Sequence, residues 1–303
     1  MQNIATLLLI LAPMAFAFAL PVSPSYAKKA ETALNYLVLV ILVVIGIELG
    51  LVQDIKQQAG AILLYLLTLM SLTIGSGLMA LILFDKCMPT ARLSATQSVS
   101  QNNVSLRGSL LQLGCLALGF VLATCLPNAL LPPDKSIAVL LMLLLFLVGI
   151  CLKGARIGLK HALFNKRGLQ LSIIFTISTL CGGVLFSLLF ADVSISQGLA
   201  LASGFGWYSL SGTIMTEAYG AVWGTVALFN DLGREILALL FIPWVMRLSP
   251  SAAIGLGGVT SLDFTLPTLT QAGGTELIPL IISFGLISNV ISPVLMVFFA
   301  SLT

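Results

Sequence analysis

Long apolar runs separated by short polar segments constrain this chain more than any other feature of its sequence. An α-helix needs roughly 17 to 25 mostly apolar residues to cross about 30 Å of hydrocarbon. Runs close to that length lie at about 4–20, 34–52, 59–84, 107–126, 137–153, 169–191 and 277–302. Only 8% of the 303 residues are charged and 58% are hydrophobic, whereas soluble domains carry about 25% charged residues. We therefore predict an all-α polytopic membrane protein in which residues 1–303 form a single transmembrane domain.

The sequence is less regular between the last two of these runs. Residues 222–246 read as one continuous helix, but 195–220 and 250–270 are interrupted by Gly, Ser, Thr and Pro. A membrane helix can break at such residues where protein or a cavity surrounds it. The sequence leaves open whether these two broken segments cross the bilayer or re-enter it, so we predict roughly eight to ten transmembrane segments.

Basic residues in the loops predict the orientation of the chain, because positive residues remain on the cytoplasmic side of a membrane. The loop 153–167 contains no acid but contains Lys153, Arg156, Lys160, Lys166 and Arg167. We place it inside, and alternation then places Lys28, Lys29 and the polar linker 85–106 inside too. Both termini are then outside. The linker joins helical units at about 4–84 and 107–191, and 195–303 form a C-terminal core.

Cysteine, histidine and net charge narrow the range of functions. Five cysteines are scattered without a CxxC pair, and the one histidine, His161, lies in the basic loop. We therefore predict neither a metal site nor a cofactor. The net charge of +3 follows from the basic loops and gives no reason to expect nucleic acid binding. An intramembrane protease is disfavoured, because the sequence has no Gly-Asp pair and no membrane histidine to act as a base. We expect a non-enzymatic protein whose surroundings are the lipid bilayer; a homo-oligomer is left open.

Four charged residues lie inside strongly apolar sequence between positions 202 and 244. They are Glu217, Asp231, Arg234 and Glu235. A charged side chain at the centre of a bilayer costs about 3 kcal/mol on insertion scales, so these side chains need partners, water or a ligand. Spacings of three and four residues place the last three on adjoining parts of one helix face. In one interpretation Asp231 and Arg234 neutralise each other. Even then one acid is left over, which favours a bound cation, a proton or both.

Two glycine-rich segments on either side of that helix predict broken helices. One is Gly257–Pro267, in which Asp263 follows glycines and hydroxyl residues and Pro267 interrupts the helix. The other is Ser203–Gly212, which adds Trp207 and Tyr208. These two rings either face a cationic ligand or belong to an interfacial aromatic belt. The ends of a broken helix expose carbonyls for an ammonium and amides for a carboxylate.

Two weak internal similarities bear on the architecture. Val44–Leu49 resembles Leu147–Leu152, and Trp207–Ser211 resembles Val259–Asp263. Chance is one explanation in so leucine-rich a chain. The other is a pair of inverted repeats, which in secondary transporters bring broken helices together at mid-membrane.

The same segments resemble the bacterial lysine exporters of the LysO type. The resemblance covers most of the chain and is closest in Ala202–Gly212 (ASGFGWYSLSG), Phe229–Glu235 (FNDLGRE) and Thr260–Pro267 (TSLDFTLP), with LFLVGI at Leu145–Ile150 adding to it. It implies a multi-pass protein of the bacterial inner (cytoplasmic) membrane that exports L-lysine and toxic analogues such as thialysine. It also implies acids in the site at Glu217, Asp231, Glu235 and Asp263.

Energetics suggests how such export is coupled. Lysine carries one net positive charge, so moving it out against an inside-negative potential costs about 2.3 kcal/mol per 100 mV. Exchange of one proton inward for one lysine outward is electroneutral, so we predict lysine/proton antiport with Asp231 as the exchanging carboxylate. Glu235 and Asp263 are then ammonium partners, and Arg234 is an ion partner or a contact for the α-carboxylate. The predicted substrate- and proton-binding residues are Trp207, Tyr208, Ser209, Ser211, Glu217, Asn230, Asp231, Arg234, Glu235 and Asp263. A monovalent cation/proton antiporter is the alternative.

Overall fold

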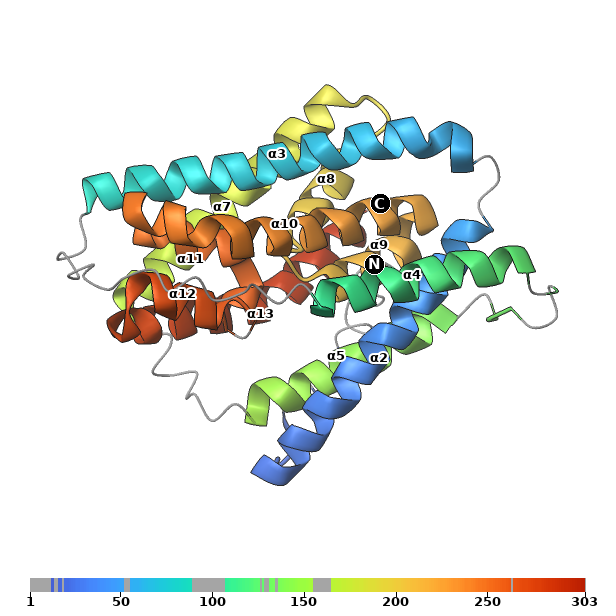
Figure 1. Cartoon of the computed structure of the whole chain (residues 1–303), viewed down its shortest axis with the longest axis horizontal. Helices are drawn as coiled ribbons and strands as arrows, with labels where there is room; N and C mark the ends of the chain where they lie inside the picture. The colour runs from blue at the N-terminus through green and yellow to red at the C-terminus, as the bar shows by residue number, and fades with distance from the viewer. Residues whose placement is uncertain are drawn as a thin grey trace.

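The computed structural model contains α-helices and short 3-10 helices, and no strands, over the residues that it describes (Figure 1). These residues are 12–13, 16–17, 19–51, 55–88, 107–125, 127, 131–133, 136–154, 165–262 and 264–302. The helices are α2 (Pro24–Gly50), α3 (Ile55–Cys87), α4 (Arg107–Cys125), α5 (Ser136–Gly154), α7 (Lys166–Leu189), α8 (Ile195–Ala202), α9 (Tyr208–Tyr219), α10 (Ala221–Leu248), α11 (Pro250–Gly257), η2 (Gly258–Leu262), α12 (Leu266–Gly273), η3 (Thr275–Leu277) and α13 (Ile278–Ala300). The all-α prediction is confirmed. His161, Asp263 and most of the linker 85–106 lie outside the described residues.

Four of the described helices are long and apolar enough to cross a membrane. The candidate spans are Ser25–Ile47, Ala59–Cys87, Lys166–Leu189 and Ile278–Ala300, and the apolar stretches Gly114–Cys125 and Val139–Cys151 are shorter. The continuous helix predicted at 222–246 is confirmed as α10, whose 28 residues extend about 42 Å. The chain is thus a helical membrane protein, and the number of crossings stays a prediction.

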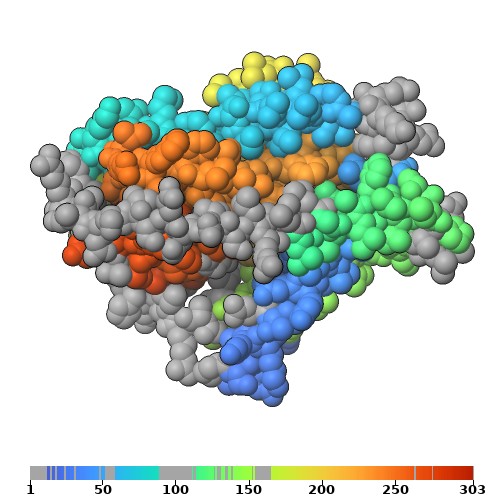
Figure 2. Space-filling model, in the orientation of Figure 1, coloured from blue at the N-terminus to red at the C-terminus, as the bar shows by residue number. Residues whose placement is uncertain are grey.

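α2, α4 and α5 form one group of helices at the side of the molecule (Figures 1 and 2). Glycines let α2 and α4 pack in close contact: a Cβ at Gly46 would collide with the Leu116 carbonyl, and one at Gly119 with the Val43 carbonyl. Close backbone approach at small residues is how helices associate in lipid, where apolar burial gives little driving force. This group is held together mainly by packing.

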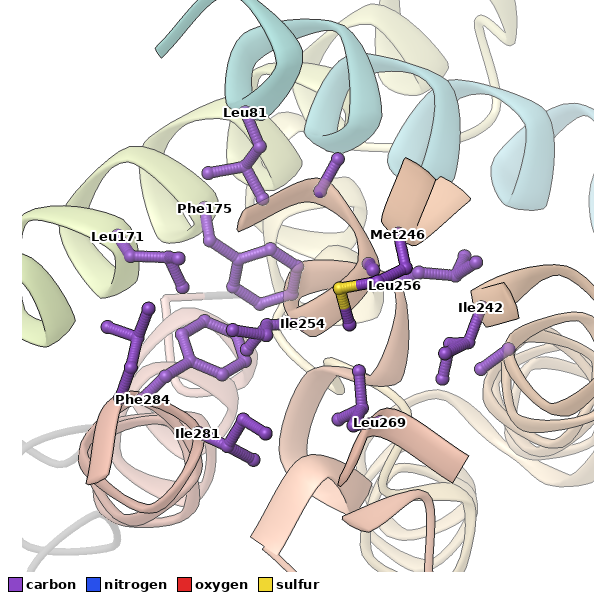
Figure 3. Close-up of a cluster of buried hydrophobic side chains, with 14 of the residues drawn as sticks. Leu81, Leu171, Phe175, Ile242, Met246, Ile254, Leu256, Leu269, Ile281 and Phe284 are labelled. Carbon is purple, nitrogen blue, oxygen red and sulfur yellow. The ribbon is translucent and has the colours of Figure 1, made fainter. Parts of the chain in front are cut away.

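Most of the remaining helices surround a core centred on Phe175 of α7. Its ring centroid lies 5.1 Å from that of Phe205 and 5.2 Å from that of Phe284. Figure 3 shows the Phe175 ring between Leu81 of α3 and Phe284 of α13. Side chains from α3, α7, α10, α11, α12 and α13 all join this core, which therefore fixes the helices around the two broken segments.

The first broken segment, α8–α9, begins and finishes beside the same end of α3. Before α8, Asp192 accepts a hydrogen bond from the Tyr65 hydroxyl of α3 at 2.6 Å. After α9, the Trp223 ring stacks on the Tyr65 ring with centroids 5.0 Å apart. The prediction that 195–220 is broken is confirmed, and the segment forms a hairpin whose base lies at what we call the Tyr65 end.

The second broken segment, α11–α12, forms a hairpin based at the opposite end of α3. At its start, the Ser249 and Ser251 hydroxyls donate to Asp85 of α3 at 2.5 and 2.6 Å. At its finish, Gly273 packs against Met246 in the last turns of α10. The prediction that 250–270 is broken is confirmed, and we call this side of the molecule the Asp85 end. The two hairpins therefore enter the molecule from opposite ends.

Candidate functional site

The two hairpins meet at their breaks. The backbone turns there through left-handed conformations, with φ values of 53° at Phe205, 96° at Gly206 and 58° at Gly258. The Val259 amide donates to the Phe205 carbonyl at 3.0 Å, which joins one break directly to the other. A left-handed conformation at a non-glycine residue such as Phe205 costs free energy and is found mainly at functional sites. The junction of the breaks is therefore the candidate site.

Asp231 of α10 lies against the first break and is 1% exposed. Its Oδ1 accepts hydrogen bonds from the Gly206 amide and the Asn230 side-chain amide, both at 3.1 Å. Its Oδ2 has no hydrogen-bond partner and faces Gly204, where a Cβ would overlap it. Because Gly206 lies just before α9, the carboxylate is at the positive end of that half-helix.

Arg234 is 2% exposed. Its side chain passes close to Gly206 of the first break, where a Cβ would lie 3.3 Å from its Cδ, but its guanidinium bonds to the second break. Its Nη1 donates to the Gly255 carbonyl in the last turn of α11 at 3.3 Å, and the guanidinium lies 5.4 Å from the Phe175 ring centroid. This is the negative end of a half-helix, which favours a cation. Both Asp231 and Arg234 belong to the described residues, and they form no ion pair with each other. The two side chains therefore hydrogen-bond to different hairpins.

Two polar residues of α13 complete the junction. The Ser292 hydroxyl donates to the Ser203 carbonyl at 2.8 Å and to the Gly204 carbonyl at 3.2 Å, at the end of α8. The Asn289 side-chain amide donates to the Val259 carbonyl at 3.0 Å in the second break. Sequence reasoning missed both, although two polar residues three positions apart in so apolar a helix are a usable signal.

Several predicted residues are brought together at this junction. Asn230, Asp231, Arg234 and Glu235 are all buried in the middle of α10. Ser209 and Ser211 are buried in the first turn of α9, where the Ser211 hydroxyl donates to the Tyr208 carbonyl at 3.3 Å. Trp207 and Tyr208 are half-buried beside the first break, and Trp207 packs against the core clusters on both sides of it.

One predicted acid lies apart from this group, and another is outside the described residues. Glu217 is exposed in the last turn of α9, and Asp231 is about 15 Å along α10 from the turn that joins the two helices. The structure does not describe Asp263. Within the described residues, no group of three or more His, Cys, Asp or Glu is arranged to hold a metal ion.

Comparison with known proteins found one family model and two relatives that match most of the chain. A family model described as "Lysine exporter LysO" matches residues 113–300. "Lysine exporter LysO" of Escherichia coli (strain K12) is 34% identical over 296 residues, covering 97% of this chain and 99% of that protein. A "Putative lysine exporter" of Haemophilus influenzae (strain ATCC 51907 / DSM 11121 / KW20 / Rd) is 47% identical over 189 residues, covering 62% of this chain and 96% of its own length. No solved structure matches the chain.

Proposed function

Because the chain belongs to the lysine exporter LysO family, a family of transporters rather than enzymes, we propose that it exports L-lysine and analogues such as thialysine from a bacterial cell. Export is by exchange for protons. The observation that carries the proposal is the environment of Asp231. One of its carboxylate oxygens caps the first break, and the other is buried without a partner. A buried oxygen of this kind needs a proton or a donor from a ligand.

The ammonium of lysine fits the acceptors at this position. The Asn230 Oδ1 is also buried without a partner, on the side chain whose amide nitrogen donates to Oδ1 of Asp231 at 3.1 Å. An ammonium has three donors and no acceptor, so two neighbouring oxygens satisfy most of its hydrogen bonds. Glu235 is buried one helical turn further along α10 and, with Asp263, is proposed as a second ammonium partner. Glu217, exposed beyond the turn, is proposed to attract the cation along its path.

Coupling follows if Asp231 binds a proton and an ammonium in turn. Lysine efflux alone works against the membrane potential by about 2.3 kcal/mol per 100 mV. Exchange for one proton cancels this charge movement, so that the pH gradient drives export. Arg234 is held by the α11 carbonyl end, which keeps it close to the substrate as the proposed partner for the α-carboxylate without neutralising Asp231. Ser209, Ser211, Trp207 and Tyr208 line the same break and are proposed to complete the cradle.

We propose that the Asp85 end is cytoplasmic and that the protein lies in the inner membrane. Lys86 at the end of α3 and Lys166 and Arg167 at the start of α7 lie at this end, which agrees with the positive-inside rule. The hairpins α8–α9 and α11–α12 are then re-entrant from opposite faces, and both chain termini are outside. The segments α7–α10 and α10–α13 are related as inverted repeats that share α10.

The test is efflux of labelled L-lysine from cells that lack their own exporter and are loaded with a lysyl dipeptide. Asp231→Asn is compared with wild type and with Glu276→Gln, which changes an exposed acid in η3, at equal membrane abundance. We expect rapid efflux from wild type and Glu276→Gln and its loss in Asp231→Asn. No lysine efflux from a well-inserted wild type would refute the proposal, and cation-dependent proton flux from the same cells would favour a monovalent cation/proton antiporter.

A further inference from the structure

Asp85 is the centre of a polar network at the base of the α11–α12 hairpin. Its carboxylate accepts from the Ser249 hydroxyl at 2.5 Å, and from the Ser251 hydroxyl at 2.6 Å and amide at 2.9 Å. It also forms an ion pair of 2.5 Å with Arg167 of α7, and the Arg167 guanidinium lies 4.0 Å from the centroid of the Phe84 ring. The two side chains are 9% and 21% exposed. The end of α3, the start of α7 and the start of the hairpin are thus tied together through one carboxylate.

Tyr65 makes the corresponding connection at the other end of α3. Its hydroxyl donates to Asp192 just before the α8–α9 hairpin, and its ring contacts Phe190 at the end of α7 with centroids 4.8 Å apart. Trp223, just after the hairpin, covers the same ring. This base is held by one hydrogen bond and by aromatic packing, whereas the opposite base is held by an ion pair and three further hydrogen bonds to Asp85.

From these contacts we infer that α3 carries one latch for each hairpin: the Asp85 latch (Asp85, Arg167, Ser249 and Ser251) and the Tyr65 latch (Tyr65 and Asp192). The inference rests on the proposed transport function. The hairpin tips meet at the junction that holds Asp231 and Arg234. Separating either base from α3 therefore opens a path to that junction from one end only.

Alternating access gives the latches their role. An exporter exposes its site to one side of the membrane at a time, so the two bases have to be released in turn. Both latches are closed in this structure, which is the occluded arrangement. Asp85 and Tyr65 are positioning residues, because they act on the site only through the hairpins.

The latches are tested by the reactivity of buried cysteines placed one helical turn inside each of them, in a chain whose five native cysteines are replaced by serine. Leu81→Cys lies where α3 contacts Gly255 of α11, and Leu69→Cys lies in the core cluster near Phe186 and Val193; both leucines are 0% exposed. A membrane-impermeant maleimide is added to the cytoplasmic face of inside-out vesicles or to the external face of intact cells. The rates are measured for the parent and for Arg167→Gln, Ser251→Ala and Tyr65→Phe.

We expect Arg167→Gln and Ser251→Ala to raise labelling at position 81 from the cytoplasmic face roughly tenfold, the change in equilibrium constant that follows loss of one hydrogen bond to a charged group. Labelling at position 69 from outside should stay constant or fall. Tyr65→Phe should raise labelling at position 69 from outside, and labelling at position 81 from the cytoplasmic face should stay constant or fall. If either set of changes exposes both cysteines equally, or neither, the bonds only stabilise the fold and the inference is wrong.

A cross-link between Asp85→Cys and Ser251→Cys, made with a short bis-thiosulfonate, closes the Asp85 latch permanently. We expect it to stop lysine efflux and a reducing agent to restore it, whereas continued efflux in the cross-linked protein would show that transport does not require this base to open. If lysine is not the substrate, the unlinked parent shows no lysine efflux, while the labelling rates still report on both latches. Failure of the proposed function is thereby distinguished from failure of the latches.

Discussion

Replacing Gly204 by alanine tests the position of the Asp231 carboxylate with the addition of one methyl group. The Gly204 backbone has no left-handed φ, so alanine is conformationally allowed. Its Cβ would overlap Oδ2 of Asp231 and lie 2.9 Å from Cγ and 3.1 Å from Oδ1. The carboxylate must then move, and Oδ1 loses at least one of its bonds to Gly206 and Asn230. One hydrogen bond to a charged group is worth about 1.5–3 kcal/mol.

That loss corresponds to a decrease of about tenfold to a hundredfold in the rate of lysine efflux. The matched control is Gly75→Ala, because a Cβ at Gly75 meets nothing within 4 Å and alanine is favoured in a helix. Efflux of labelled lysine is measured for Gly204→Ala, Gly75→Ala and wild type at equal membrane abundance.

Full efflux by Gly204→Ala would show that the carboxylate does not lie against this glycine during transport. An equal loss in Gly75→Ala would show that the assay reports general damage to the protein rather than displacement of Asp231.

Three other predictions follow from the same geometry. Ser292→Ala leaves the Ser203 and Gly204 carbonyls without their side-chain donor, so we expect a several-fold loss of lysine efflux. Ser301→Ala is the control, because its exposed hydroxyl bonds only to its own helix, and should change efflux little. Equal effects of the two substitutions would contradict the role of α13. Arg234→Lys keeps the charge but not the planar guanidinium that contacts the Gly255 carbonyl and the Phe175 ring. Lysine efflux should therefore fall at least tenfold at unchanged protein abundance. Efflux by Arg234→Lys at the wild-type rate would contradict a role for this contact. In proteoliposomes, lowering the pH by one unit on the side that receives lysine should raise the limiting lysine gradient roughly tenfold, since one proton is exchanged per lysine, whereas a gradient that follows membrane potential alone would exclude electroneutral antiport.

Much of the fold was predictable because lipid leaves few alternatives for the backbone. Apolar runs of membrane-crossing length marked α3, α7 and α13, and Gly, Ser and Pro marked the two breaks. Hydropathy does not reveal that each broken segment returns to the end from which it came, because a hairpin and a crossing can have the same composition. That property depends on contacts distant in sequence, such as Tyr65 with Asp192 and Trp223.

The burial of the charged residues on α10 was predictable from the sequence, whereas their hydrogen-bond partners were not. The spacing of Asp231, Arg234 and Glu235 correctly indicated a buried charged face on one helix. The same spacing also suggested an Asp231–Arg234 ion pair, because residue spacing gives information only about partners within one helix. The partners that the structure provides are backbone groups of the breaks, and backbone groups carry no sequence signal. Asp85 was overlooked for a related reason: it lies where an apolar run meets a polar linker, and there an acid is usually solvated.

Compensation by half-helix ends gives Asp231 a property that an ion pair would remove. A helix end supplies the equivalent of about half an elementary charge, whereas a guanidinium supplies a full one. A carboxylate paired directly with Arg234 would be neutralised and would have little affinity for a second cation. Beside the N-terminal end of α9, Asp231 is stabilised enough to remain buried. Part of its charge is nevertheless uncompensated, and its Oδ2 has no hydrogen-bond partner. That remainder suits either a proton or an ammonium, as the proposed antiport requires, because Arg234 directs its hydrogen bond to the other hairpin and forms no ion pair with Asp231.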